Sequence, residues 1–474
     1  MASSFLSLLL LTTSALGATT VPSFVAPAPA PTATSPSIYV GASNTTLNKT
    51  TVVPGKSFDR FIQIWLENTD FDDAVNSTQF QKYIKQGLLL NSYYAVTHPS
   101  VKPNYIASVS GDFFGMHDDA FYSIPNNIST VVDLLDAKNI SWASYQENEP
   151  SDGYLGFNFT QPNYLNTSAP PYTYYVRKHN PLIIFSSVSS VPARASLIRN
   201  FNDFAVDVNA GAYPQWSFIT PNLVNDGHDT DVGFISSWLE FWLDPLLADE
   251  NFNDNRTLIL LTFDENENGK INNKVSSILL GGALPANLKG TNDSTYYTHY
   301  STLSTVQLNW GLGTLGRGDA NKTMANVFSF VADAAGYKNE NITGAAIPLT
   351  NFSGTYPGAL NANIYIPFIA PNVSAVSPAG QPVFLAPGLN TSLTLANAPA
   401  PVNLTAKGEP LPGGVGTPGV GGAPPAATSA SGAGAKPTTA GGGGTSGAVG
   451  FGRTAASLAA VCVGVVVVGL GMIL

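Results

Sequence analysis

Cysteine and charged residues are scarce in this chain of 474 residues. The single cysteine, Cys462, lies in an apolar run at the C-terminus, so disulfide frameworks, Cys-based zinc sites and cysteine nucleophiles are excluded elsewhere. Any metal must be held by oxygen and imidazole ligands. Charged residues make up only 11%, and the net charge is −10 with no cluster of Lys and Arg. We therefore expect no nucleic-acid partner, because phosphate backbones attract basic surfaces.

Both ends of the chain carry segments typical of secretion and surface attachment. Residues 1–18 have an apolar stretch followed by small residues, which predicts a signal peptide, and residues 19–57 form an N-terminal spacer. Residues 407–447 are rich in Gly, Pro, Ala, Ser and Thr, a composition that predicts a stalk. Residues 448–474 end in an apolar run without a basic flank, which favours a GPI-anchor propeptide over a retained membrane span.

Acceptor sites for N-glycans, Asn-X-Ser/Thr, recur from Asn44 to Asn403. Their spread predicts a surface coated with N-glycans, as expected of a protein that passes through the secretory pathway. Together with the terminal segments, they predict a secreted glycoprotein whose lipid anchor holds it in the outer leaflet of the plasma membrane or at the cell wall.

The middle of the chain alternates between predicted strands and helices. The predicted strands are 60–66, 215–220, 257–263 and 275–280. The predicted helices are 130–138, 234–247 and 301–310. This alternation predicts an α/β domain over residues 58–344, with a central, mostly parallel sheet and helices on both faces. Residues 345–406 break into short apolar runs between Pro, Asn and Gly, which predicts a small β-rich extension.

Polar clusters follow two of the predicted strands. Glu67 and Asn68 come after the first strand, and Asp264 and Glu265 come after the third. Because parallel strands present their carboxyl ends at one edge of a sheet, these four oxygen ligands are candidates for a divalent-cation site. Ser100 is the candidate nucleophile, since a serine hydroxyl needs a base or a metal to react at neutral or acidic pH.

Phosphoryl transfer is the reaction class that most needs such a site, because negative charge spreads over the phosphoryl oxygens in its transition state. Asn104, Lys178 and the histidines, including His179, are candidate donors to those oxygens. Simpler interpretations remain open at this point. Acidic residues after strands often cap helices or form turns, and Ser100 between two prolines is compatible with a turn or N-cap.

The chain also resembles a known family over a series of motifs in the expected order. The motifs are FDRFIQIWLENTDFDD (58–73), THPSVKPNYIASVSGD (97–112), SWASYQENEP (141–150), YVRKHNPLIIF (175–185), SFITPNLVNDGHDTDV (217–232), TLILLTFDENE (257–267) and YYTHYSTLSTVQLNWGLGTLGRGD (296–319). They resemble secreted fungal-type acid phosphatases of the phosphoesterase family, which also includes bacterial phospholipases C.

The resemblance implies an alkaline-phosphatase-like α/β fold and a metal-assisted serine phosphoesterase. It implies that Ser100 of the His-Pro-Ser motif is the nucleophile and that Asn104 contacts the phosphate or the nucleophile loop. The residues that it implies as metal ligands are Glu67, Asn68, Asp264 and Glu265. The Gly-His-Asp and His-Tyr-Ser elements place His228, Asp229 and His299 as further ligands, phosphate contacts or a general acid.

Two features of the sequence depart from the family pattern. Val101 and Lys102 separate the serine from Pro-Asn-Tyr, where the family usually has one residue, and Gln307 replaces a common Glu. A displaced nucleophile loop would alter substrate range or weaken activity.

The sequence therefore predicts an acid phosphatase that hydrolyses phosphate monoesters through a phosphoserine, with a divalent metal ion as cofactor. The expected catalytic residues are Ser100, His228 and His299, the substrate-binding residues are Asn104, Lys178 and His179, and the metal ligands are Glu67, Asn68, Asp264, Glu265 and Asp229. Two alternatives are a phospholipase C-like phosphodiesterase and a catalytically silent cell-wall glycoprotein.

Overall fold

The computed structural model describes residues 46–98, 101–166, 168–348 and 355–412. All of them belong to the first of two compact units, residues 1–424. The second unit, 425–474, lies outside the described residues, as do the predicted signal peptide and almost all of the predicted stalk. Within the described ranges, no helix combines the length and the apolar character needed to cross a membrane.

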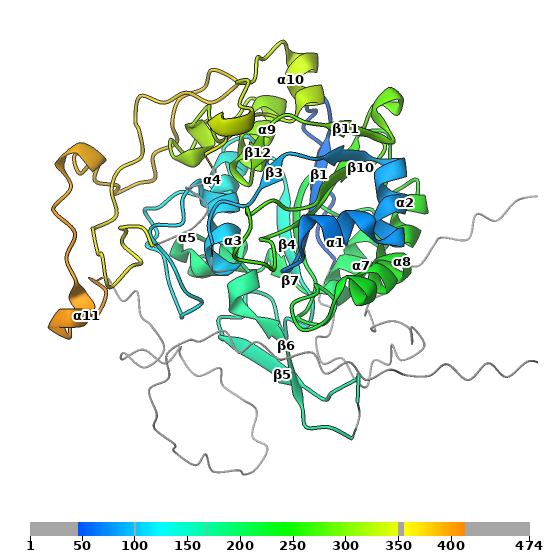
Figure 1. Cartoon of the computed structure of the whole chain (residues 1–474), viewed down its shortest axis with the longest axis horizontal. Coiled ribbons are helices and arrows are strands. Elements are labelled where there is room, and N and C mark those ends of the chain that lie inside the picture. Colours follow the sequence, from blue (N-terminus) through cyan, green and yellow to red (C-terminus); the bar gives the residue numbers. More distant parts are fainter. Residues whose placement is uncertain (1–45, 99–100, 167, 349–354, 413–474) are drawn as a thin grey trace, which may run out of the picture. The chain divides into compact units, whose positions relative to one another are not determined.

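The first unit is built on an eight-stranded sheet (Figure 1). In spatial order its strands are β11 (Thr291–Asp293), β2 (Leu88–Leu90), β10 (Ser277–Leu280), β9 (Thr257–Phe263), β1 (Arg60–Leu66), β8 (Trp216–Thr220), β4 (Trp142–Gln146) and β7 (Ile198–Arg199). Strand β10 is antiparallel to β9 and β2, and the other neighbouring pairs are parallel. The strands predicted from sequence are confirmed as β1, β8, β9 and β10.

Strand β1 lies at the centre of the sheet because its sequence, RFIQIWL, can be buried on both faces. Ile64 pairs with Ile219 of β8 on one side and with Leu261 of β9 on the other. Every residue of β1 after Arg60 is buried, and the Trp65 ring stacks on Phe218 with centroids 5.2 Å apart. The core therefore fixes the strand whose carboxyl end leads into the polar clusters.

Helices cover both faces of this sheet, as expected for the α/β class. Their bounds are α1 (Phe71–Asn76), α2 (Thr78–Gln86), α3 (Val101–Ser110), α4 (Val131–Asp136), α5 (Ser186–Ser189), α6 (Pro192–Ala195), α7 (Phe201–Asn209), α8 (Val232–Ala248), α9 (Tyr300–Trp310), α10 (Ser329–Ala335) and α11 (Leu404–Lys407). Figure 1 shows α1, α2, α7 and α8 on one side of the sheet and α3, α4 and α9 on the other. The three predicted helices are confirmed as α4, α8 and α9.

Capping residues set the ends of the two longest helices. The Asp231 side chain accepts a hydrogen bond from the Phe234 amide at 2.9 Å, which starts α8 directly after the loop that carries the Gly-His-Asp motif. Helix α9 ends at Gly311, whose φ of 63° is left-handed and suits glycine. The capping residues Asp231 and Gly311 thus fix where α8 begins and where α9 ends.

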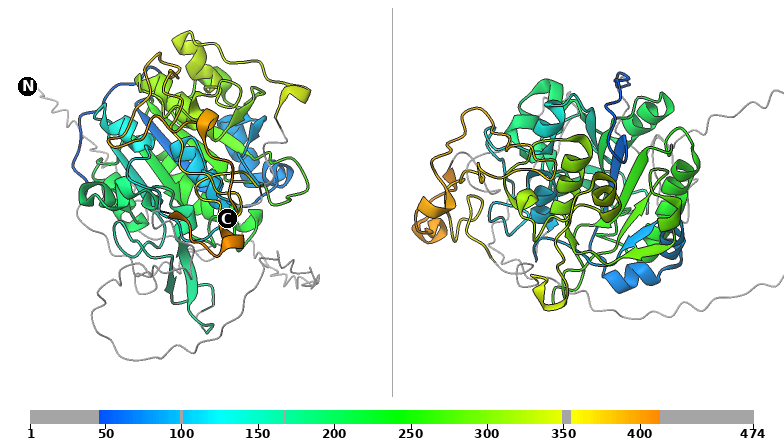
Figure 2. Two further views of the ribbon diagram at one scale, coloured as in Figure 1. Left: turned by 90° about the vertical axis from the view of Figure 1, so that its left-hand side faces the viewer. Right: turned by 90° about the horizontal axis from the view of Figure 1, so that it is seen from above.

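Two small strand pairs lie outside the main sheet. Strand β3 (Tyr93–Tyr94) pairs with β12 (Tyr297–Thr298), and β5 (Asn158–Gln161) pairs with β6 (Tyr172–Val176) as an antiparallel hairpin. The β5–β6 hairpin extends away from the sheet in Figure 1 and in the left view of Figure 2. Directly after β6 comes the 3-10 turn η2 (Arg177–His179), so the hairpin leads into two candidate site residues.

The prediction of a β-rich extension at 345–406 is wrong for the part of it that the structure describes. Backbone pairing there is limited to isolated bridges, such as Tyr365 with Val402 and Thr314 with Val383, and α11 begins at Leu404. Prolines interrupt the short apolar runs, and proline has no amide hydrogen to donate to a strand ladder. The segment is an irregular covering, and the regular sheet is confined to the α/β core.

Candidate active site

Two parallel strands deliver carboxylates to the same edge of the sheet. Glu67 directly follows β1 and Asp264 directly follows β9, and both side chains are fully buried. The Asn68 amide donates to Asp264 Oδ1 at 3.3 Å. Asn68 has a φ of 41°, a left-handed conformation that asparagine tolerates better than most residues. The turn after β1 is therefore bonded to the end of β9.

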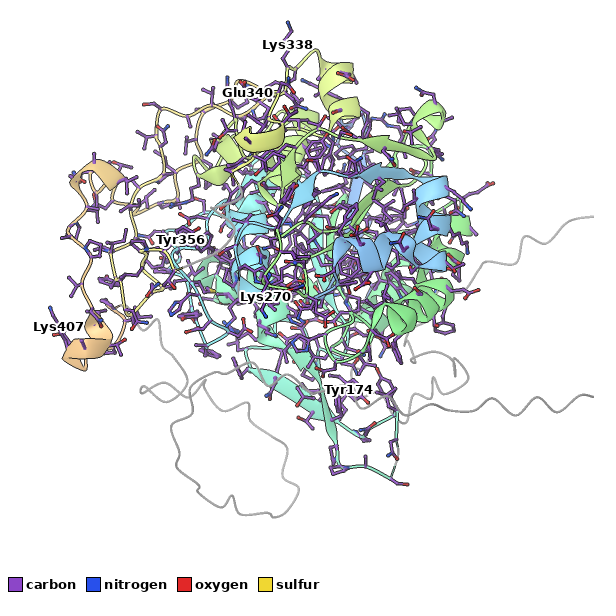
Figure 3. The ribbon with its side chains drawn as sticks, in the orientation of Figure 1. Tyr174, Lys270, Lys338, Glu340, Tyr356 and Lys407 are labelled. Atoms are coloured by element: carbon purple, nitrogen blue, oxygen red, sulfur yellow. The ribbon has the colours of Figure 1, made fainter. Side chains whose placement is uncertain are left out.

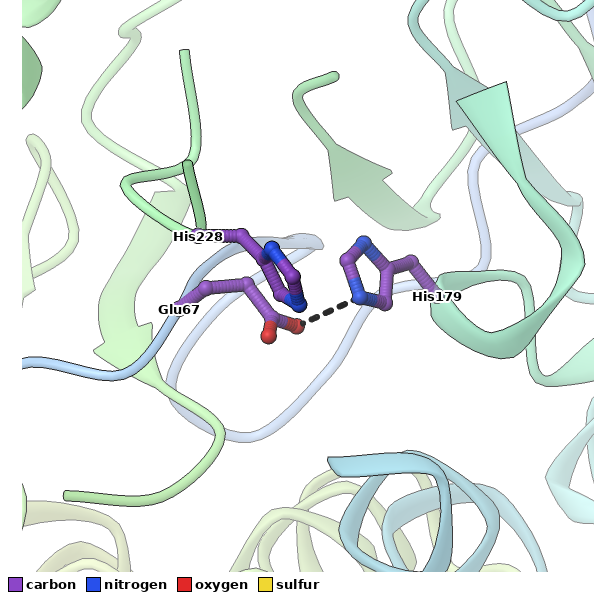
Figure 4. A group of neighbouring side chains, drawn as sticks. All are labelled: Glu67, His179 and His228. Atoms are coloured by element: carbon purple, nitrogen blue, oxygen red, sulfur yellow. Dashed lines mark ion pairs between the residues drawn. The ribbon is translucent and has the colours of Figure 1, made fainter. Parts of the chain in front are cut away.

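Glu67, His179 and His228 form a group whose candidate ligand atoms all lie within 4.8 Å of one another (Figure 4). His179 Nε2 is 3.1 Å from Glu67 Oε1, and the Tyr105 hydroxyl donates to the same oxygen at 2.7 Å. His179 comes from the turn after β6, whereas His228 comes from the loop between β8 and α8. Three separate segments of the chain thus converge at one point.

The chemistry of this group fits a divalent cation. Mixed carboxylate and imidazole ligands suit first-row divalent metals. Among the described residues, Glu67 Oε2 and Asp264 Oδ2 are buried and have no hydrogen-bond partner. A buried polar atom without a partner costs about 1–3 kcal/mol, and a bound cation would remove that cost.

Four buried carboxylates face this site, and burial is the main reason that their pKa values are raised. The pKa of Glu67 is raised further by Asp264, and the pKa of Asp264 by Glu265. Burial and Glu67 raise the pKa values of Asp226 and Glu265. The positive charge of Lys178 acts in the opposite direction and lowers the pKa of all four carboxyl groups. Such crowding of acidic groups is typical of a functional site that holds positive charge.

Lys178 is the ammonium group of the site. Its Nζ lies 2.9 Å from His228 Nε2 and 3.3 Å from Asp119 Oδ2. Burial lowers the pKa of Lys178, but Asp119 and Glu67 outweigh it and hold the pKa above its ordinary value. Lys178 therefore carries a positive charge next to the Glu67, His179 and His228 group.

Asp229 lies behind His228. Its Oδ1 is 2.7 Å from His228 Nδ1, and its other oxygen accepts a hydrogen bond from the Tyr172 hydroxyl. The His228 amide donates to Asp226 Oδ1 at 2.8 Å, which fixes the loop on its other side. The structure thus places Asp229 against Nδ1 of His228, the ring nitrogen that does not contact Lys178. The role of Asp229 as a metal ligand stays a prediction.

Asn104 holds the segment that precedes the predicted nucleophile. Its Oδ1 accepts hydrogen bonds from the amides of Val96 and Thr97 at 2.9 and 3.1 Å, and its Nδ2 donates to the Thr97 carbonyl at 3.0 Å. Ser100 lies outside the described residues, directly before α3. The structure therefore gives Asn104 a loop-holding position, and its contact with substrate stays a prediction.

His299 is fully buried beneath the end of β9. Its Nε2 donates to the Asp264 carbonyl at 2.6 Å, and Tyr93 lies 3.2 Å from its Nδ1. A carbonyl oxygen only accepts, so the proton is on Nε2 and Nδ1 accepts from the Tyr93 hydroxyl. Burial lowers the pKa of His299 to about 4. Both ring nitrogens are engaged, and a catalytic role for His299 stays a prediction.

Glu265 lies beside His98 of the His-Pro-Ser motif. His98 Nδ1 is 3.4 Å from Glu265 Oε2, and His98 Nε2 is 2.8 Å from Asn266 Oδ1. Burial lowers the pKa of His98. These contacts join the segment before Ser100 to the end of β9.

Sequence reasoning missed four residues that the structure brings to the site. Asp226 and Tyr105 lie within quoted motifs, and Asp226 is 3.2 Å from His179 Nδ1. Asp119 follows His117, and only its contact with Lys178 identifies it. Tyr172 comes from the hairpin, and no motif in the sequence indicates its bond to Asp229.

Comparisons with known proteins identify the family of the chain. The family model described as Phosphoesterase matches residues 72–313. The chain is 49% identical to a probable acid phosphatase of Kluyveromyces lactis, over 70% of this chain and 75% of that protein. It is 48% identical to an acid phosphatase of Aspergillus fumigatus, over 66% of this chain and 67% of that protein.

Among solved structures, the chain is similar to a phosphonate monoester hydrolase of Agrobacterium radiobacter. The TM-score is 0.36 and the sequence identity is 11%, over 59% of this chain and 78% of that one.

Proposed function

The chain belongs to the phosphoesterase family and is an acid phosphatase, and we propose that it hydrolyses phosphate monoesters through a phosphoserine formed at Ser100. As Ser100 Oγ bonds to phosphorus it gives up its proton, the bond from phosphorus to the leaving oxygen breaks, and that oxygen takes up a proton. Water then attacks phosphorus and releases Ser100 and inorganic phosphate. The observation that carries the proposal is the group Glu67, His179 and His228 at the carboxyl edge of the sheet, in which Glu67 and His179 are buried and His228 is partly exposed.

Glu67, His179 and His228, with Asp264 beside them, are the residues that would hold a divalent cation. When bound, the cation would withdraw negative charge from the phosphoryl oxygens and ease deprotonation of an attacking hydroxyl. The buried Glu67 Oε2, which has no hydrogen-bond partner, supports this assignment because a cation held by Glu67 would satisfy it.

Lys178 and Asn104 act without the cation in this proposal. Lys178 carries its charge next to the cluster, so its Nζ would donate to the phosphoryl oxygens, which gain negative charge in the transition state. Asn104 bonds three backbone groups of the segment that leads to Ser100 and limits the positions open to the nucleophile. Phosphate-monoester hydrolysis is among the slowest uncatalysed reactions, so such charge neutralisation is required.

The test compares hydrolysis of p-nitrophenyl phosphate and bis-p-nitrophenyl phosphate by the purified full-length protein at several pH values. We expect monoester turnover that Ser100→Ala abolishes, that a chelator lowers and that an added divalent cation restores. Ser190→Ala, which changes an exposed serine outside the N-glycan acceptor sites, is the matched control and should keep full activity. Preference for the diester would favour a phospholipase C-like phosphodiesterase. Folded protein without turnover of either ester would favour the silent cell-wall glycoprotein.

We further propose that the phosphatase works outside the cell. Residues 1–18 would direct secretion, residues 58–344 would form the catalytic domain with 345–406 as its extension, and residues 407–447 would form a stalk. Residues 448–474 would be exchanged for a GPI anchor in the outer leaflet of the plasma membrane. The sequence patterns support these assignments and the N-glycans. We expect a phosphatidylinositol-specific phospholipase C to release the protein from intact cells. We also expect N-glycanase treatment to lower the mass of the protein.

A further inference from the structure

The β5–β6 hairpin contacts the candidate active site through a tyrosine. Tyr172 is the first residue of β6, and its hydroxyl donates to the Asp229 carboxylate. The same strand continues into Lys178 and His179, which both lie at the site. Strand β6 therefore reaches the site at its first residue, Tyr172, and again through the turn that directly follows it.

The bonds of Asp229 determine which nitrogen of His228 carries the proton. A carboxylate oxygen only accepts, so His228 Nδ1, 2.7 Å from Asp229 Oδ1, is the donor in that contact. The lone pair of neutral His228 is then on Nε2. The Lys178 ammonium, 2.9 Å from Nε2, independently indicates the same tautomer because an ammonium only donates. His228 therefore presents an acceptor nitrogen to the site.

Aromatic packing holds Tyr172 in place. Its ring lies 4.9 Å from Tyr174, and Tyr174 is stacked on Tyr164 with centroids 4.2 Å apart. Figure 3 labels Tyr174 on this hairpin. The Leu223 amide donates to the Tyr174 carbonyl at 3.1 Å, and the Asp229 amide donates to the Leu223 carbonyl at 2.9 Å. The hairpin and the His228 loop are thus bonded together through both backbone and side chains.

We infer that Tyr172 is a positioning residue, whose hydroxyl holds Asp229 so that Asp229 fixes the tautomer and ring orientation of His228. Asp229 then acts behind the imidazole, where carboxylate partners of metal-binding histidines commonly lie. This inference rests on the proposed function, because it assigns Tyr172 to the same cation and phosphate site. It also explains why Tyr172, which lies outside the quoted motifs, has its hydroxyl bonded to Asp229.

The experiment measures cation affinity apart from catalysis. Co²⁺ is titrated into the full-length protein after chelation, and its visible absorption bands report binding by imidazole and oxygen ligands. We expect Tyr172→Phe to weaken Co²⁺ binding about tenfold, since loss of an outer partner of a metal ligand typically costs 10–100-fold. Tyr154→Phe is the matched control, because the Tyr154 hydroxyl donates to the Asn158 carbonyl on the same hairpin at 3.1 Å. This variant should bind Co²⁺ as the wild type does.

A double-mutant cycle separates positioning from simple loss of stability. If Tyr172 acts through Asp229, then Tyr172→Phe should change Co²⁺ affinity by less than twofold in an Asp229→Ala background. Independent, additive losses would overturn the inference, and so would unchanged Co²⁺ affinity in Tyr172→Phe. The proposed function fails separately, if the wild type hydrolyses no monoester. A wild type that hydrolyses monoesters but binds no Co²⁺ would overturn the inference and leave the phosphatase assignment standing.

Discussion

Replacing Glu67 with glutamine should make the metal-free protein more stable while removing most of its activity. Glu67 Oε1 accepts the Tyr105 hydroxyl at 2.7 Å, and glutamine can keep that bond with its carbonyl oxygen. Glu67 Oε2 is buried without a partner, and burial together with Asp264 raises the Glu67 pKa. Glu67→Gln removes the charge but hardly changes the volume of the side chain, so it isolates the electrostatic term.

The magnitude follows from the buried charge, because glutamine has no charge to bury beside Asp264. Burying a group without compensation costs about 1–3 kcal/mol, so the free energy of unfolding in chelator at neutral pH should rise by about that amount. With a cation present at a hundred times its Kd, the wild type should gain about 2.7 kcal/mol, whereas the variant should gain much less. The order of stability of the two proteins should therefore reverse when the cation is added.

Thermal unfolding with chelator and with an added divalent cation, beside kcat/KM for p-nitrophenyl phosphate, tests both halves of this prediction. We expect kcat/KM to fall by about 100-fold or more, because the cation supplies several kcal/mol of charge stabilisation. Glu240→Gln, at an exposed glutamate of α8, is the control and should change neither quantity. Wild-type kcat/KM in Glu67→Gln, or an unchanged response to the cation, would refute the assignment of Glu67 as a ligand.

Three further predictions concern residues around the site. Burial raises the pKa of Glu147 to about 8, so its contribution to stability should be full below pH 4.5 and lost as pH rises through 8. Urea unfolding of wild type and Glu147→Gln should show that the wild type loses stability relative to the variant over this range, and parallel curves would contradict it. Asn104→Ala should lower the free energy of unfolding by about 2–4 kcal/mol, measured in urea, because it removes three buried hydrogen bonds. Gly227→Ala should reduce kcat/KM at least tenfold, because Gly227 has a φ of 105° and an added Cβ would lie 2.4 Å from Ile235, displacing the loop that carries His228. Unchanged kcat/KM in that variant would mean that the loop adapts freely.

Strands β1, β8, β9 and β10 and helices α4, α8 and α9 were predictable because each carries its own local signal, whereas short strands such as β4 and β7 were not predicted. The apolar run of β1 is buried on both faces, and the aromatic stripe of α8 follows directly after a capping Asp231. The segment 345–406 shows the limit of such signals. Short apolar runs between prolines are compatible with strands, but proline has no amide hydrogen to pair them.

The residues of the site were easier to predict than their partners. Glu67 and Asp264 follow strands of one parallel sheet, so pattern and topology together bring them to one edge. The bond from Tyr172 to Asp229 depends on how the hairpin packs on the loop before α8, and no local pattern encodes that packing. The contact of Tyr93 with His299 was also not predictable from local pattern. It depends on the pairing of β3 with β12, which are distant in sequence.

The central position of β1 has a consequence for how the chain acquires activity during synthesis. β1 is made first among the strands, yet its partners β8 and β9 emerge much later, and Asn68 bonds Asp264 across 196 residues of chain. Contacts so distant in sequence form late and slowly, because long loops must close before they form. The candidate cation site is therefore assembled only when most of residues 58–344 have been made, and an incomplete chain would be unable to hydrolyse phosphate esters.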